Sequence, residues 1–113
     1  MPARLNYVEL TAFDVGTAKR FYEEAFGWAL TDFGPTYAAT TTGDTDIGIQ
    51  ADSAEAVGAP LPVIEVDDLE AALAAVLDAG GTLAKPIFAF PGGRRFHFLD
   101  PSGNELAAVK ADH

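Results

Sequence analysis

The feature that most constrains this chain is an internal repeat. Residues 6–28 (NYVELTAFDVGTAKRFYEEAFGW) and residues 60–82 (PLPVIEVDDLEAALAAVLDAGGT) share one layout at an offset of 54 residues. Each segment has a short apolar run, an aspartate, apolar residues at helical spacing and a closing glycine. The repeat predicts two copies of one supersecondary unit, and 113 residues suffice for both copies to share one core in a single domain.

The first half predicts one helix and four strands. A strand is expected over residues 5–12, followed by a helix that Asp14 caps and Gly27 ends. Glycine- and proline-containing turns then separate three further strands, expected over residues 28–33, 37–42 and 47–51. The apolar spacing predicts that the buried stripe of this helix consists of Val15, Ala18, Phe21, Tyr22, Ala25 and Phe26.

The second half repeats this order. A strand over residues 61–66 precedes a helix capped by Asp67 or Asp68, and Asp67 with Glu70 resembles a capping box. Gly80-Gly81 ends this helix, and Pro86 predicts that the next strand, 82–88, lies at an edge or carries a bulge. Strands over residues 94–99 and 104–109 complete the βαβββ order. The buried stripe of this second helix is expected to consist of Leu69, Ala72, Leu73, Val76 and Leu77.

Composition excludes several classes of protein. Seventeen acidic against seven basic residues give a net charge of −10, spread over both halves, and Arg94-Arg95 is the longest basic run. Nucleic acid and anionic membranes are therefore poor partners, whereas a cationic ligand would be attracted. Without cysteine there is no disulfide framework and no zinc–thiolate site. No apolar run approaches the roughly 20 residues that span a bilayer, and no secretory leader is evident, so we expect a cytoplasmic protein.

Two groups of motifs carry a resemblance to a known family. The first module contains Asp14, Phe21-Tyr22 and Phe26-Gly27-Trp28, and the second contains VDDL (66–69), AGG (79–81) and FLDPSGNE (98–105). With the repeated βαβββ order, the chain resembles the vicinal oxygen chelate superfamily of glyoxalases, bleomycin-resistance proteins and extradiol dioxygenases. The resemblance implies an α+β fold of two βαβββ modules, with a mixed sheet cupped around a central cavity. Module one would span residues 1–51, a linker 52–60 and module two 61–113 of a single domain.

The resemblance also implies where a metal would bind. Metal-dependent members of the superfamily place one ligand on each of four strands, and matching motifs puts these positions at Tyr7, Ile49, Leu61 and Ala107. Three of these side chains have no donor atom, and a tyrosine would have to lose a proton with a pKa of about 10. We therefore expect neither a metal nor another cofactor. An unrelated metal site built from three glutamates, Glu9, Glu65 and Glu105, is the less favoured alternative.

Strand alternation predicts which side chains line the cavity. The expected ligand-binding residues are Tyr7, Glu9, Trp28, Tyr37, Ile49, Leu61, Val63, Glu65, Arg95, His97 and Ala107. This makes a mostly apolar and aromatic pocket with a few charged groups, as is typical of small-molecule sites. Simpler interpretations stay open: Glu9 pairs with Arg95, His97 is a hydrogen-bonded wall residue, and Trp28 packs in a core or an interface.

Three functions remain after these exclusions. The favoured hypothesis is a metal-independent protein that binds a small organic ligand in this cavity, with the acidic charge favouring a cationic one. The alternative is a lyase or isomerase in which Glu9 or His97 acts as general acid or base and Arg95 stabilises an oxyanion. A partner-binding module is the third, but no exposed amphipathic stretch favours it. Open sheet edges and the linker 52–60 also predict a homodimer.

Overall fold

The computed structural model describes residues 3–112 and confirms an α+β fold with the βαβββ order repeated twice. The chain divides into two compact units. The first unit consists of residues 7–61, and the second consists of the residues up to Asn6 and those from Pro62 onward. Strand β1 (Ala3–Thr11) therefore contributes to both units. Over residues 3–112, neither helix is both long and apolar enough to cross a bilayer.

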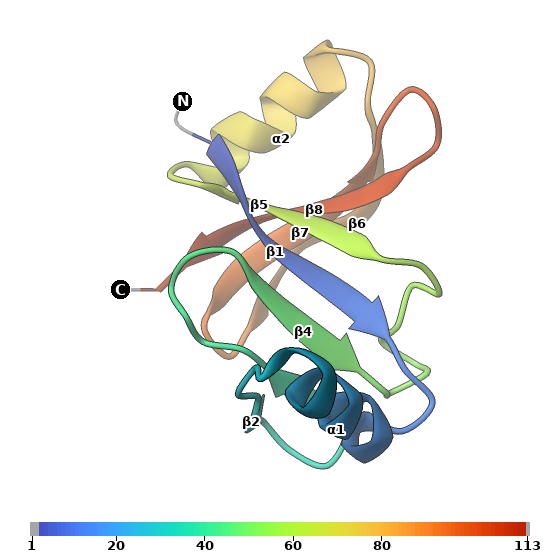
Figure 1. Cartoon of the computed structure of the whole chain (residues 1–113). Coiled ribbons are helices and arrows are strands. Elements are labelled where there is room, and N and C mark those ends of the chain that lie inside the picture. Colours follow the sequence, from blue (N-terminus) through green and yellow to red (C-terminus); the bar gives the residue numbers. More distant parts are fainter. Residues whose placement is uncertain (1–2, 113) are drawn as a thin grey trace. The chain divides into compact units, whose positions relative to one another are not determined.

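The first unit contains helix α1 (Val15–Phe26) and strands β2 (Thr31–Asp32), β3 (Tyr37–Ala39) and β4 (Asp46–Gln50) (Figure 1). The strand order is β2-β3-β4-β1, with β4 antiparallel to β3 and parallel to β1. The predicted helix ends are confirmed. Asp14 accepts a 2.9 Å hydrogen bond from the backbone N–H of Thr17, and Gly27 adopts a left-handed φ of 71°.

The apolar stripe of α1 is narrower than its sequence predicts. Val15, Ala18 and Tyr22 pack on a core of Leu30, Ala38 and Ile49. Phe21 and Phe26 are 57% and 61% exposed, and Ala25 is exposed as well, so the expected stripe is wrong at these three positions. The physical reason is the small sheet beneath the helix: β2 and β3 have only two and three residues, too few to cover a wide stripe.

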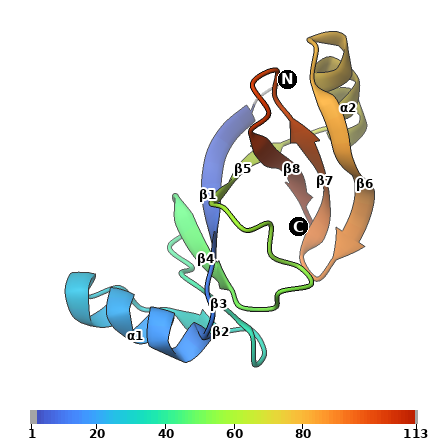
Figure 2. The ribbon, with the colours of Figure 1, turned by 90° about the vertical axis from the view of Figure 1, so that its right-hand side faces the viewer.

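The second unit contains strand β5 (Leu61–Val66), whose first residue belongs to the other unit, helix α2 (Leu69–Asp78) and strands β6 (Thr82–Phe90), β7 (Gly93–Leu99) and β8 (Glu105–Ala111). The strand order is β5-β8-β7-β6, with β5 parallel to β8 and both β6 and β8 antiparallel to β7 (Figure 2). Strands β6 and β7 form a long hairpin at one side of this sheet.

The cap of α2 is Asp68, which accepts a 3.0 Å hydrogen bond from the backbone N–H of Ala71. Glu70 does not complete a capping box, so that prediction is wrong. Its carboxylate instead accepts a 2.8 Å hydrogen bond from Arg94, which lowers the pKa of Glu70. An ion pair between α2 and β7 therefore takes the place of the expected hydrogen bond within the helix N-terminus.

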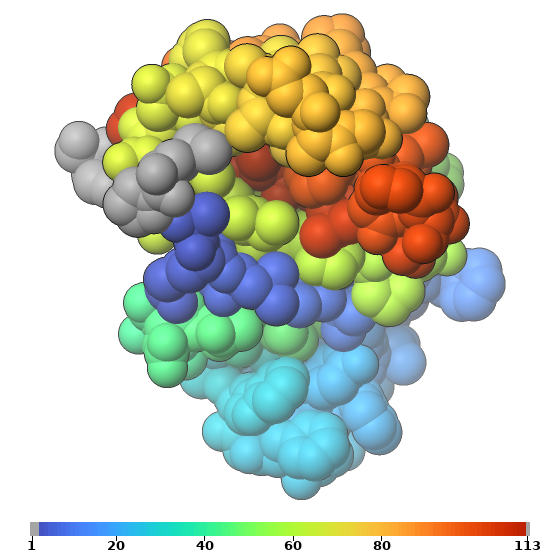
Figure 3. Space-filling view, turned by 90° about the horizontal axis from the view of Figure 1, so that it is seen from above, coloured from blue at the N-terminus to red at the C-terminus, as the bar shows by residue number. Residues whose placement is uncertain are grey.

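The core of the second unit lies between α2 and the sheet. It contains Val66, Leu69, Ala72, Phe96 and Ala108, with Leu73 and Val76 packed against it. Side chains of α2, yellow to orange in the space-filling view, form a continuous cover on this part of the molecule (Figure 3). Leu77 was expected in the stripe but is 49% exposed, because it lies near the end of the helix.

Strand β6 lies at the edge of this sheet and is irregular around Pro86, as predicted. Its pairing with β7 shifts register between Leu83 and Lys85 and again between Lys85 and Phe88. Proline has no N–H to donate to a neighbouring strand, which is tolerated at an edge and at a bulge. The strand continues beyond its predicted end at residue 88 to Phe90.

Candidate functional site

In the second unit, the two faces of the sheet have different chemistry. Phe96 and Ala108 pack under α2, and Phe98 packs against the same core. Because side chains alternate along a strand, Arg95, His97 and Ala107 lie on the opposite face. This confirms the facing predicted for β7. We call the side chains of Phe88, Phe90, Arg95, His97 and Glu105 the module-two cluster.

Aromatic rings flank the guanidinium in the module-two cluster. The Cζ atom of Arg95 lies 5.3 Å from the ring centroid of Phe88 and 5.4 Å from that of Phe90. Both distances are within the range of cation–π attraction. The ring of His97 lies 5.9 Å from the ring of Phe88, so one phenylalanine contacts both polar groups.

The imidazole of His97 is fully buried and held by one carboxylate. Its Nδ1 lies 2.8 Å from Oε2 of Glu105. Burial lowers the pKa of His97 and the nearby Arg95 lowers it further, while the hydrogen bond to Glu105 opposes both effects. The neutral imidazole is therefore favoured at neutral pH. Within residues 3–112, Nε2 of His97 has no hydrogen-bond partner.

Sequence reasoning missed Phe88, Phe90 and Glu105 as members of this cluster. In a regular strand, residues three apart, such as Lys85 and Phe88, point to opposite faces. The register shifts of β6 bring them together, and the Lys85 ammonium lies 5.9 Å from the Phe88 ring centroid. Pro86 was the available signal for a bulge, but it does not reveal the direction of the shift. Glu105 was expected only near the rim.

The first unit holds a second polar cluster, consisting of Tyr7, Glu9 and Tyr37. The hydroxyl oxygens of Tyr7 and Tyr37 are 2.5 Å apart, and the Tyr37 hydroxyl lies 3.4 Å from Oε2 of Glu9. Glu9 is only 4% exposed. It is paired across the sheet with Gly48, where a Cβ would meet both tyrosine hydroxyls within about 2.1 Å. Glycine at position 48 therefore makes room for the tyrosine pair.

Two of the predicted lining residues lie elsewhere in the first unit. Ile49 is paired with Leu10 and belongs to the core under α1, so it lies on the face opposite Tyr7 and its expected facing is corrected. Gly48 lies on the Tyr7 face instead. Trp28 stacks on Tyr22 of α1, with ring centroids 5.5 Å apart and planes within 9°. Its observed contacts are therefore with aromatic residues of the helix.

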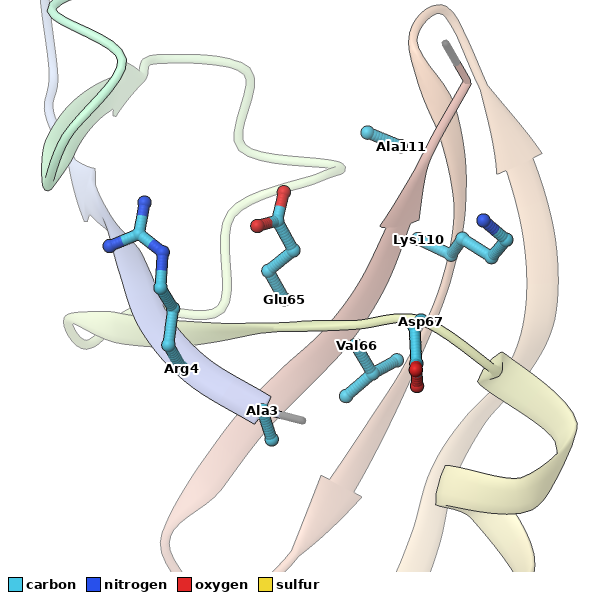
Figure 4. Close-up of a pocket in the computed structure, with 7 residues that line it drawn as sticks. All are labelled: Ala3, Arg4, Glu65, Val66, Asp67, Lys110 and Ala111. Carbon is cyan, nitrogen blue, oxygen red and sulfur yellow. The ribbon is translucent and has the colours of Figure 1, made fainter. Parts of the chain in front are cut away.

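Of the remaining predicted residues, Leu61, Val63 and Ala107 are buried. Glu65 lies in a pocket of about 290 Å³ in the second unit, whose lining is Ala3, Arg4, Glu65, Val66, Asp67, Lys110 and Ala111. Figure 4 shows the side chains of Arg4 and Glu65 projecting to the same side, whereas Asp67 points the other way. This pocket is lined by residues of both charges and shares no residue with the module-two cluster.

The residues at the family's metal positions do not fit a divalent metal. The Tyr7 hydroxyl is engaged with Tyr37, Ile49 lies in the helix-side core, and the side chains of Leu61 and Ala107 contain no donor atom. Across residues 3–112, no three His, Cys, Asp or Glu side chains gather closely enough to hold a metal ion. The alternative site of three glutamates is therefore not formed in that part of the chain.

The fold and these clusters can be compared with known proteins. The family model of the Glyoxalase/Bleomycin resistance protein/Dioxygenase superfamily matches residues 4–108. The chain belongs to this superfamily. It is 32% identical over 118 residues to a protein of Mycobacterium tuberculosis named as a glyoxylase, CFP32, and 29% identical over 123 residues to the anthracycline biosynthesis protein DauV of a Streptomyces species. The alignments cover 95% and 97% of this superfamily member but only 45% and 42% of those relatives, so it spans less than half their length.

Solved structures show the same fold at lower identity. The methylmalonyl-CoA epimerase of Mycobacterium tuberculosis matches with a TM-score of 0.76 and 16% identity, over 96% of this superfamily member and 88% of the epimerase. A glyoxalase/bleomycin resistance protein/dioxygenase superfamily member from Vibrio splendidus matches with a TM-score of 0.70 and 17% identity, over 96% and 99% of the two chains. These likenesses establish the glyoxalase-like fold.

Proposed function

We propose that this superfamily member binds a small organic molecule, without a metal, on the sheet faces that its helices leave uncovered. The observation that carries the proposal is the module-two cluster. There, an arginine and a fully buried histidine lie among aromatic rings on the face opposite α2. A few placed polar groups within aromatic and apolar surroundings are what small-molecule sites consist of. Relatives named for a glyoxylase and for anthracycline biosynthesis support a small organic ligand.

Metal independence is the first part of this proposal to test. We expect the purified protein to contain far less than one equivalent of zinc, nickel, iron or manganese per chain, because the four family positions offer no suitable donor set. Elemental analysis after purification without chelators measures this. One equivalent of metal per chain, whose removal lowers the melting temperature, would contradict it.

A cationic ligand is favoured by the acidic charge of the chain and by the buried carboxylate of Glu9. Replacing Glu9 with Gln keeps the shape of the side chain but removes its charge. If Glu9 contacts a cationic group, affinity should fall about 10- to 100-fold, since a charge-assisted hydrogen bond contributes roughly 1.5–3 kcal/mol. Titration calorimetry with the ligand identified by mass spectrometry measures the change.

The matched control is Glu24→Gln, which makes the same change on the exposed side of α1. Its affinity should stay within about twofold of wild type. Equal losses in the two variants would show that Glu9 acts only through the net charge of the protein. Lower stability of Glu9→Gln with unchanged affinity would show that Glu9 is a structural partner.

The second candidate function is a lyase or isomerase that uses Glu9 or His97 as general acid or base. The observation favouring it is the pairing of His97 with Glu105 at 2.8 Å, since a carboxylate that orients an imidazole is a common arrangement in acid–base catalysis. The Glu9→Gln variant separates the two functions. If the protein is an enzyme with Glu9 as base, Glu9→Gln should lose turnover and retain ligand affinity. A binding protein would show no turnover in either the wild type or the variant.

We also propose that the protein forms a homodimer. Phe13, Phe21, Phe26 and Phe33 are each more than half exposed, and together with Trp28 they leave much aromatic surface on the first unit. A second copy of the chain could cover this surface, as exposed apolar surface commonly marks an interface. Multi-angle light scattering should give twice the chain mass of 11.9 kDa at micromolar concentration. A monomer mass under these conditions would contradict the proposal.

A further inference from the structure

The buried Nε2 atom of His97 is the feature of the second unit that its internal contacts leave unexplained. His97 is fully buried, and its other ring nitrogen is engaged by Glu105 at 2.8 Å. Within residues 3–112, Nε2 has no hydrogen-bond partner. A buried polar atom without a partner is destabilising, so native proteins seldom retain one unless a ligand, a water molecule or a reaction uses it.

The chemistry of the neighbours decides which kind of partner Nε2 can take. The oxygens of a carboxylate accept hydrogen bonds, so we assign the proton of this contact to Nδ1 of His97. Burial and the positive charges of Arg95 and Lys85 disfavour a second proton on the ring, although Glu105 favours one. A neutral ring protonated at Nδ1 has a lone pair on Nε2. That atom is therefore an acceptor and needs a donor.

The side chain packed beside this imidazole is aromatic. The ring of Phe88 lies 5.9 Å from that of His97, and its π-face also attracts the guanidinium of Arg95, 5.3 Å from the centroid. A flat apolar group would pack well in these surroundings, whereas a ligand that presents only a carboxylate would bring acceptors and no donor to Nε2.

We propose that Nε2 of His97 accepts a hydrogen bond from a hydroxyl group on a flat, unsaturated ligand, of the phenol or enol type. Glu105 is then a positioning residue, because it fixes the ring and its tautomer without touching the ligand. The inference rests on the proposed small-molecule function and deepens it by naming the ligand class. The inference also assigns to the module-two cluster a preference for a hydroxyl group, which the net charge of the chain alone would not predict.

A pair of probes tests the hydroxyl directly. Phenol and toluene have nearly the same size and shape, but only phenol has a donor. In nitrogen-15 NMR spectra of the full chain at neutral pH, we expect His97 to show the neutral tautomer protonated at Nδ1. Phenol should shift the Nε2 resonance in a saturable manner, and toluene should leave that resonance in place.

Variants then test the role of Glu105. Glu105→Ala should shift His97 toward the tautomer protonated at Nε2 and weaken phenol binding about tenfold. The control is Glu70→Ala, which removes a surface partner of Arg94 in the same unit and should leave both the tautomer and phenol affinity unchanged. Thermal melts establish that each variant is folded. The tautomer of His97 in the wild type is measured directly, so that part of the test does not depend on the folding of any variant.

Several results would overturn the inference. One is a proton on Nε2 of His97 in the wild type, and another is an equal shift of the Nε2 resonance with toluene. A third is no shift at His97 with phenol, which would leave a buried water molecule as the partner of Nε2. Phenol that binds elsewhere, with His97 unmoved, overturns the hydroxyl contact but leaves the proposed function intact. The proposed function itself fails on a separate measurement, the absence of any bound organic molecule in native mass spectra.

Discussion

Replacing Phe96 with alanine should lower the free energy of unfolding by about 3–5 kcal/mol. The Phe96 side chain is fully buried, between α2 and the sheet of the second unit, where it packs with Leu69, Ala72 and Ala108. The substitution removes apolar contacts and leaves a cavity that the surrounding strands cannot readily fill. Because a domain of this size is stable by only about 5–15 kcal/mol, much of the protein's stability would be lost. Urea denaturation followed by circular dichroism measures the change.

The matched control for this prediction is Phe26→Ala. Phe26 is 61% exposed and lies outside the core of the first unit. Replacing Phe26 should lower the free energy of unfolding by less than about 1 kcal/mol, because folding buries little of the apolar surface of this side chain. Similar losses in the two variants would mean that Phe96 is not in a packed core.

Replacing Asp46 with alanine should lower the free energy of unfolding by about 2–4 kcal/mol. Its buried carboxylate accepts hydrogen bonds from the hydroxyls of Thr40 and Thr42 at 2.7 and 2.8 Å, and from the backbone N–H groups of Thr42 and Gly43 at 2.8 and 3.0 Å. These bonds hold the turn between β3 and β4, and the variant would leave four donors without their acceptor. Asp78→Ala, at the exposed end of α2, is the control and should change stability little.

The same carboxylate makes stability depend on pH. Burial acts to raise the pKa of Asp46, but the hydrogen bonds from Thr40, Thr42 and Gly43 outweigh it and lower the pKa below its ordinary value of 3.8. The folded state then binds the proton less tightly than the unfolded chain does. The stabilisation is present above pH 3.8 and disappears as the pH falls through the lower folded value. Asp46→Asn should therefore lose less stability than wild type as the pH falls from about 4 to about 2. An equal loss in the two proteins would contradict this.

The helices and their ends could be predicted because their determinants are local. Asp14 caps the first helix and Gly27 ends it, and Asp68, one of the two predicted candidates, caps the second helix. Each of these roles depends only on a residue and its immediate neighbours. The βαβββ order followed from the repeat for the same reason. The exposure of Phe21 and Phe26 could not be predicted, because it depends on how long the strands beneath the helix are.

The candidate site was predicted less completely, because it depends on register. Arg95 and His97 were placed correctly opposite α2, since β7 alternates regularly. Ile49 was placed on the wrong face, because one residue of offset along β4 exchanges the faces, so that Gly48 takes the position beside Glu9. Phe88 was missed because a bulge shifts the alternation of β6 by an amount that the sequence does not specify.

The glutamate that orients His97 was missed for a related reason. Glu105 contacts His97 diagonally, because the residue directly opposite His97 is Ala107, whose side chain is too small to fill the space. Predicting such a contact requires the register of the two strands and the size of the residue that lies between the contacting side chains. It becomes visible only when β7 and β8 are paired.

The most direct test of the proposed function is native mass spectrometry of the chain as purified, before and after treatment with a metal chelator. We predict a bound organic molecule of small mass that survives chelation, is released on denaturation and can be identified from the released fraction. A chain that carries no organic molecule and binds none from a metabolite extract, or one that loses its ligand together with a stoichiometric metal ion, would contradict the account.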